Sequence, residues 1–249
     1  MSESIYKESY KDLLGVMAKI SIEMPEIITL DYFDKFDANN KYLLSLFIES
    51  YKSALIVCES MNNVCIAQAA VVLRLLLESV SLIRVLTKYP ELQEKYIDHY
   101  KIRLKIGRDP KKEWKILEEA FPNVNKNKRL SYMDYGWFES KLQTKVENGE
   151  LKVPYPNETE LIKLAGFDDI ISWKKLYLDK LSHQSYTIVN MIDDNSEIPI
   201  IVNFIEILCK LFDYLCCDFH NLTKFAFVFE GKNLFLDEFK KLYTLDAFK

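Results

Sequence analysis

A few side chains in this 249-residue sequence could do chemistry, and two of them interrupt an unusually apolar stretch, residues 64–88. Arg74 and Glu78 are four residues apart, so a helix places them on the same face. Because an isolated ion in apolar surroundings is very costly, both charges need partners. The pair therefore predicts either an internal ion pair that fixes helix register or a polar pocket with desolvated, reactive charge.

A second group of candidates lies about one hundred residues later, at the end of a predicted helix. Tyr177 is followed on the same helix end by Ser182 and His183. A helix C-terminus favours the charged form of a histidine. One interpretation makes His183 a general acid–base that acts with Arg74 and Glu78, with Tyr177 and Ser182 as ligand contacts. The other makes His183 a capping or core histidine bonded to an acid such as Glu78.

The other two histidines are interpreted as structural. His99 and Arg103 are four residues apart on a polar helix, and an exposed face of mixed charge accounts for both. His220 follows Asp218 near the end of an apolar helix. Aromatic and basic residues lie around His99 in the sequence, and single-stranded RNA binds to aromatic rings by stacking and to basic side chains by charge. RNA therefore stays a possible partner.

Several function classes are disfavoured by what the sequence lacks. There is no GxGxxG, GxxxxGK[ST], HExxH or GxSxG motif. A formal net charge of −4 without a basic block disfavours a dedicated nucleic-acid coat and a polybasic membrane binder. We expect no metal and no cofactor, because the five cysteines form no CxxC pair and lie in apolar helical patterns typical of buried thiols: Cys58, Cys65, Cys209, Cys216 and Cys217.

The same features predict a cytoplasmic protein with no membrane span. The first residues are polar and contain no signal-peptide core. Charged residues interrupt both long apolar stretches, 64–86 and 198–229, and each charge would be costly at the centre of a bilayer.

The composition predicts an all-α fold, because glycine and proline are few and apolar residues recur at helical spacing. We expect a single helical bundle over 1–249, with its core at 40–120 and 157–225. Prolines and glycines crowd into 121–156, which predicts an irregular insertion there. Its aromatic segment, 132–138, should dock rather than stay disordered.

The predicted helices follow from periodicity and capping signals, with Asn39 or Asn40 as one N-cap and with Pro25 ending or redirecting the first helix. They cover 3–21, 40–61, 64–88, 90–106, 110–120, 157–165, 170–183, 198–224 and 235–247, with a further short helix expected within 138–147.

An Arg-xxx-Glu helix followed by Tyr-xxx-Leu-Ser and a histidine resembles a group of uncharacterised all-helical bacterial proteins. The resemblance covers about residues 40–225, and the matching positions are Arg74, Glu78, Tyr177, Leu181, Ser182 and His183. In that group the histidine falls a few residues after the serine, whereas here it follows directly. The group is distantly similar to HEPN-type bundles, many of which cut RNA with an Arg followed four to six residues later by His. No arginine of this sequence is followed by such a histidine.

Three functions follow from these observations, and they leave open whether the chain is an enzyme. The first is a cytoplasmic helical protein with a polar, ligand-binding site on the Arg74/Glu78 helix. The second, implied by the resemblance, is a metal-independent ribonuclease of a toxin or phage-defence type, with His183 as acid–base and Arg74 steadying phosphate charge. The third is a homodimer or interaction module that uses the aromatic segment 132–138.

Overall fold

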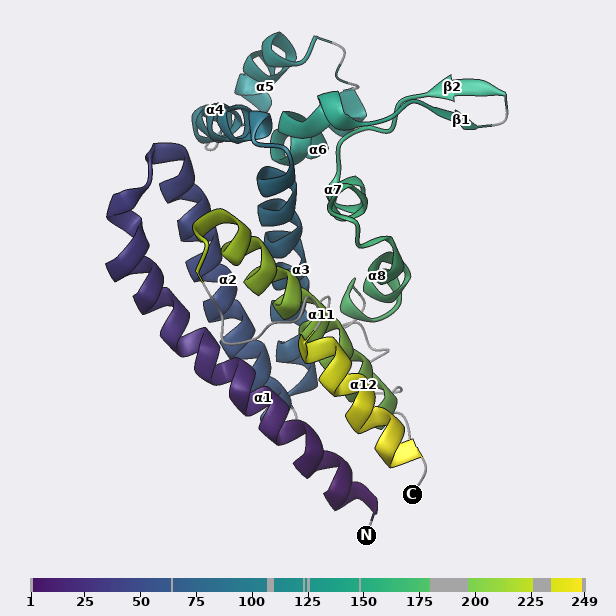
Figure 1. Ribbon diagram of the computed structural model, residues 1–249. Coiled ribbons are helices and arrows are strands. Elements are labelled where there is room, and N and C mark those ends of the chain that lie inside the picture. Colours follow the sequence, from purple (N-terminus) through teal and green to yellow (C-terminus); the bar gives the residue numbers. More distant parts are fainter. Residues whose placement is uncertain are drawn as a thin grey trace. The chain divides into compact units, whose positions relative to one another are not determined.

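The computed structural model describes residues 2–63, 65–106, 110–122, 124, 126–147, 149–179, 197–225 and 234–247. The chain divides into two compact units (Figure 1): unit 1 is Met1–Arg84 with Asp169–Lys249, and unit 2 is Val85–Asp168. The all-α fold is confirmed, since helices make up almost all the regular structure of both units. The single-domain assignment stays a prediction, and each unit is considered by itself below.

The helices of unit 1 are α1 (Ser2–Ile27), α2 (Ala38–Asn62), α3 (Ile66–Lys88, to Arg84), α8 (Asp168–Trp173, from Asp169), α11 (Glu197–Thr223) and α12 (Leu234–Ala247). The bounds of α2, α3, α11 and α12 lie within two residues of the predicted ones. The helix predicted at 170–183 begins as the short α8, and residues 180–183 lie outside the described residues. Short turns follow two of the helices, a π-helical and a 3-10 turn after α1 (Ile28–Tyr32 and Phe33–Lys35) and a π-helical turn after α8 (η5, Lys174–Leu178).

Two helix ends in unit 1 differ from the predictions. Helix α1 continues through Pro25, because Met24 and Ile28 on either side of it are almost fully buried and this packing outweighs the lost backbone hydrogen bond. The N-cap of α2 is Asp37 and not Asn39 or Asn40, since the Asp37 carboxylate accepts a 2.9 Å hydrogen bond from the amide of Asn40.

The core of unit 1 is apolar and rich in aromatic side chains from α2 and α11. The rings of Tyr51 and Phe212 meet edge to face with centroids 5.9 Å apart, and Phe47 meets Phe219 in the same way at 5.3 Å. All four side chains are fully buried. Edge-to-face pairs of this kind stabilise a core beyond their buried area, so α2 and α11 are firmly held against each other.

Unit 2 consists of shorter and more polar elements. After the end of α3 come α4 (Glu91–Ile106), α5 (Pro110–Ala120), α6 (Arg129–Tyr135), the strands β1 (Lys145–Glu147) and β2 (Glu150–Lys152), and α7 (Glu158–Ala165). Two 3-10 turns, η3 (Lys126–Lys128) and η4 (Gly136–Lys141), flank α6. Helix α7 is capped at both ends, by the Asn157 side chain at its start and by Gly166 in the left-handed region at φ 87° at its end.

The insertion predicted at 121–156 is more ordered than expected. The prediction that its aromatic segment docks is confirmed, because Tyr132, Trp137 and Phe138 are buried within unit 2. Of the helix expected within 138–147, only the part up to Lys141 is found, as the 3-10 turn η4, and β1 begins at Lys145. Asn148 and Gly149 lie between the two strands in sequence, and Asn-Gly is the strongest short signal for a tight hairpin turn.

Candidate functional site

The side chains of Arg74 and Lys174 meet at one carboxylate in unit 1, that of Asp179. The Lys174 Nζ donates to both oxygens of Asp179, at 2.8 and 3.1 Å. The Nε of Arg74, from α3, lies 3.3 Å from Oδ1 of the same carboxylate. Two cations therefore share one anion, and the three groups form what we call the Asp179 cluster.

The π-helical turn η5 explains how Lys174 reaches Asp179. Its wider turn closes a backbone hydrogen bond from the amide of Asp179 to the carbonyl of Lys174, five residues back. In a regular α-helix residues five apart are separated by about 140° around the axis, so their side chains diverge. Single π-helical turns within helices often occur at functional sites, and this one brings a lysine and an aspartate together.

The cluster is partly withdrawn from water. Lys174 is only 5% exposed, whereas the side chains of Arg74 and Asp179 are 30% and 29% exposed. A buried ammonium is costly unless a carboxylate accompanies it. Asp179 supplies that carboxylate, while the exposed part of the cluster is left to Arg74 and Asp179.

Only part of the predicted site lies within the described residues. Glu78 is half-buried on α3, one turn beyond Arg74. Tyr177 belongs to η5 by its backbone, but its side chain, Ser182 and His183 lie outside the described residues. Lys174 and Asp179 were missed by sequence reasoning, because a spacing of five does not place two residues on one face of an α-helix.

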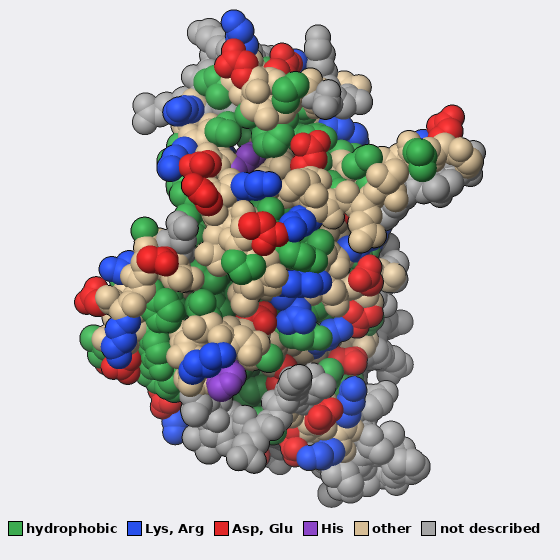
Figure 2. Space-filling model, turned by 45° about the horizontal axis from the view of Figure 1, so that its top comes forward, with side chains coloured by type: hydrophobic (Ala, Val, Ile, Leu, Met, Phe, Trp, Pro, Cys, Tyr) green, Lys and Arg blue, Asp and Glu red, His purple; other side chains and the backbone are tan. Residues whose placement is uncertain are grey.

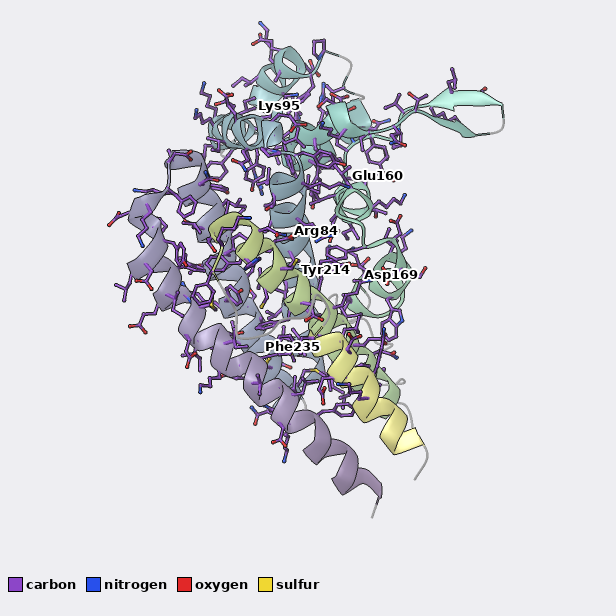
Figure 3. All side chains as sticks on the ribbon, in the orientation of Figure 1. Arg84, Lys95, Glu160, Asp169, Tyr214 and Phe235 are labelled. Atoms are coloured by element: carbon purple, nitrogen blue, oxygen red, sulfur yellow. The ribbon has the colours of Figure 1, made fainter. Side chains whose placement is uncertain are left out.

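A second arginine of α3 forms a different contact in unit 1. Nη1 of Arg84 lies 3.4 Å from Oδ1 and 3.5 Å from Oδ2 of Asp218 on α11. The guanidinium carbon also lies 3.9 Å from the centroid of the Tyr214 ring, and Figure 3 shows the two labelled residues side by side. Burial raises the pKa of Asp218 to about 6, although the charge of Arg84 opposes the shift. Arg84, Tyr214 and Asp218 together hold α3 against α11, and we call them the Asp218 contact.

Asp213, also on α11, caps the first turn of α12. Its two carboxylate oxygens accept hydrogen bonds from the amides of Phe235 and Leu236, each at 3.0 Å, and Figure 3 marks Phe235 at that helix start. Burial raises the pKa of Asp213 to about 6. Asp213 and Asp218 are almost fully buried, with exposed fractions of 6% and 5%. Capping and ion pairing account for their burial.

Two histidines have structural surroundings. His99 is buried rather than exposed as expected, with Nε2 2.8 Å from the carbonyl oxygen of Met133 and its ring edge to face with Phe121. Burial lowers the pKa of His99, so the neutral ring is favoured. His220 Nδ1 lies 2.6 Å from the carbonyl oxygen of Phe225, just beyond α11, in keeping with its structural interpretation.

Unit 2 contains a surface cavity of about 370 Å³ at the start of α7, lined by Lys152, Val153, Pro154, Tyr155, Asn157, Glu160 and Lys163. Its polar groups already have local partners. Lys163 pairs with Glu160 at 2.6 Å, and the Asn157 side chain caps α7. We therefore assign this cavity no ligand.

Other kinds of site find little support in the described parts of the chain. They contain no group of three or more histidine, cysteine, aspartate or glutamate side chains that could hold a metal ion. No helix among them combines the length and apolarity needed to cross a bilayer. On the face drawn in Figure 2, positive and negative side chains are interspersed, without the single-sign field that a nucleic acid favours.

Comparison with known proteins gives no relative from which a function could be transferred. The sequence matches no known protein family, and neither a curated protein nor a solved structure resembles it significantly. The likeness to HEPN-type bundles stays a prediction.

Proposed function

We propose that unit 1 binds a small anion, such as a phosphate or carboxylate group, at the Asp179 cluster. The observation that carries this proposal is the sharing of one carboxylate by two cations, one of them a lysine that is only 5% exposed. The three groups carry a formal charge of +1, from two cations and one carboxylate.

The chemistry of Arg74 suits such a ligand. A guanidinium presents several N–H donors in a planar fork that matches carboxylate and phosphate oxygens, and partial desolvation strengthens such charge-assisted bonds. Asp179 occupies one edge of this guanidinium, through Nε. An anion that approaches the exposed part of the cluster would bind beside Asp179 or displace it from Arg74, while Lys174 continues to neutralise the carboxylate.

Isothermal titration with inorganic phosphate, pyrophosphate and citrate, each at constant ionic strength, tests the proposal. We expect at least one of these probes to bind the wild type and to bind Arg74→Gln at least tenfold more weakly, the loss of about 1.4 kcal/mol expected for a charge-assisted contact. Binding that is equal in wild type and Arg74→Gln, or absent for all three probes, would overturn the assignment.

The ribonuclease alternative rests on the resemblance and on His183, which lies four residues beyond Asp179 in sequence. It is tested by RNA cleavage in EDTA by wild type and His183→Ala. An intact wild type that leaves RNA uncut, where a control ribonuclease cuts it, would remove this alternative.

A further inference from the structure

The β-hairpin of unit 2 has an internal register that opposes like charges. The strands β1 and β2 pair antiparallel with Lys145 opposite Lys152, Val146 opposite Leu151 and Glu147 opposite Glu150. Like charges in directly opposed positions of an antiparallel pair destabilise it. The hairpin sequence is therefore poorly matched to the pairing that it makes within one chain.

The outer edge of β2 offers a backbone for further pairing. Two residues, 148 and 149, separate the strands, so the pair that closes the turn, Glu147 and Glu150, is a hydrogen-bonded pair. Because the two pair types alternate along an antiparallel ladder, Val146 and Leu151 form a non-hydrogen-bonded pair. In a non-hydrogen-bonded pair the backbone N–H and C=O of each residue point away from the partner strand. Leu151 consequently presents its N–H and C=O at the outer edge, and in Figure 1 the hairpin extends away from the helices of unit 2.

The side chains along this edge are unusually exposed for their type. Leu151 of β2 is 76% exposed, and Val153 and Tyr155, which follow the end of β2 at Lys152, are 59% and 38% exposed. On the other face of β2 Glu150 and Lys152 are solvated, and the 3.8 Å ion pair between them leaves both free to exchange partners. An exposed edge with apolar residues is a template for pairing with another strand.

We propose that β2 pairs antiparallel with β2 of a second copy of this chain, about a twofold axis at Leu151. In this register Leu151 faces the partner's Leu151 as a hydrogen-bonded pair, which uses the outward N–H and C=O. Glu150 then lies opposite the partner's Lys152, and Lys152 opposite the partner's Glu150. The sequence Glu-Leu-Lys is thus complementary in charge to a second copy of itself, whereas the register within the hairpin opposes like charges.

A twofold axis makes the interface isologous, so each favourable charge pair occurs twice. The ladder is only three residues long on each side, and such a small contact is typical of weak, transient dimers. We expect a monomer–dimer equilibrium that is visible at protein concentrations of about 100 µM and above. This inference is independent of the anion site in unit 1.

Charge exchange in β2 tests the register. In each of the single variants E150K and K152E, the twofold axis places two pairs of like charges opposite each other. We expect the dimer dissociation constant, measured by sedimentation velocity, to rise about tenfold. The double variant E150K/K152E restores opposite charges across the axis and should dimerise like wild type. Because each single variant also removes a like-charge opposition inside the hairpin, local unfolding of β2 cannot produce this pattern. A wild type that stays monomeric, or single variants that dimerise as well as wild type, would overturn the proposal.

Cysteine cross-linking tests the position of the axis. In L151C the two introduced thiols belong to residues whose Cα atoms are about 5.5 Å apart in a hydrogen-bonded pair, within disulfide range. V153C is the matched control, since Val153 is similarly exposed but its two copies would lie about 13 Å apart along the ladder. We expect an intermolecular disulfide in L151C that is absent in V153C and in wild type, whose five cysteines give the background. Equal cross-linking of L151C and V153C would contradict this axis.

Discussion

Two arginines of α3, Arg74 and Arg84, each lie against an aspartate, and their side chains are almost equally exposed, at 30% and 28%. Their surroundings differ. Asp218 is almost buried and has Arg84 as its cation, while the Tyr214 ring covers the guanidinium. Asp179 is 29% exposed and is shared by Arg74 and the buried Lys174.

The difference indicates which contact is structural and which can bind a ligand. Removing Arg84 leaves a buried carboxylate without the charge that stabilises it, so the Asp218 contact is needed for the fold. Removing Arg74 leaves Asp179 paired with Lys174, so the carboxylate keeps a cation when Arg74 contacts another anion. Variants of each contact test this difference between the two aspartates.

The largest effect is expected for Arg84→Met. The substitution leaves Asp218 buried and removes the contact with the Tyr214 ring, which together should lower the free energy of unfolding by about 3 kcal/mol at pH 8. Urea unfolding followed by circular dichroism measures it. A loss below that of Arg74→Met would contradict the structural role of the Asp218 contact.

The next effect is a pH dependence that belongs to Asp218. Its pKa is raised from an ordinary value of 3.8 to about 6 in the folded state, so between these values the folded protein binds more protons than the unfolded chain. The contribution of Asp218 to stability therefore falls as the pH rises from about 4 to about 6, at up to about 1.4 kcal/mol per pH unit.

Asp218→Asn removes this contribution. We expect the free energy of unfolding of wild type, minus that of the variant, to be about 1 kcal/mol larger at pH 4.5 than at pH 5.5. Asp213 titrates in the same range but is present in both proteins, so it cancels in the difference. A difference that is constant or grows with pH would show that Asp218 is not the group responsible.

The smallest stability effect is expected for the Asp179 cluster. In Lys174→Met a buried cation is replaced by an apolar side chain of similar length, while Arg74 continues to pair with Asp179. Asp179 is 29% exposed and keeps Arg74, so no uncompensated buried charge is left, and we expect a change within about 1 kcal/mol in urea unfolding. A loss of 3 kcal/mol or more would mean that the cluster is needed for the fold, as the Asp218 contact is.

Much of the fold could be predicted from the sequence, because the core helices have strong apolar periodicity and clear caps. The bounds of α3, α11 and α12 differ from the predicted ones by two residues or fewer. The helix end predicted at Pro25 is wrong, because burial of the neighbouring side chains outweighs the local effect of proline on the helix. The hairpin was missed although Asn148-Gly149 signals it, because its strands are only three residues long.

The candidate site could be predicted only in part. Arg74 was identified, since a charge in an apolar helix needs a partner. Lys174 and Asp179 could not be paired from their spacing, because that pairing depends on a π-helical turn, which no residue pattern in this stretch announces. His99 was misplaced for a related reason: neighbouring charged residues suggested an exposed face, whereas the ring packs on Phe121.

The measurement that tests the comparison most directly is phosphate, pyrophosphate and citrate titration of two matched variants, Arg74→Gln and Arg84→Gln, below their unfolding temperatures. Each variant removes a half-buried guanidinium of α3 that faces an aspartate of another element. We expect Arg84→Gln to bind the active probe as wild type does although it is less stable, and Arg74→Gln to bind it at least tenfold more weakly although its stability is nearly unchanged. Equal weakening in both variants, or in Arg84→Gln alone, would contradict an anion site at the Asp179 cluster.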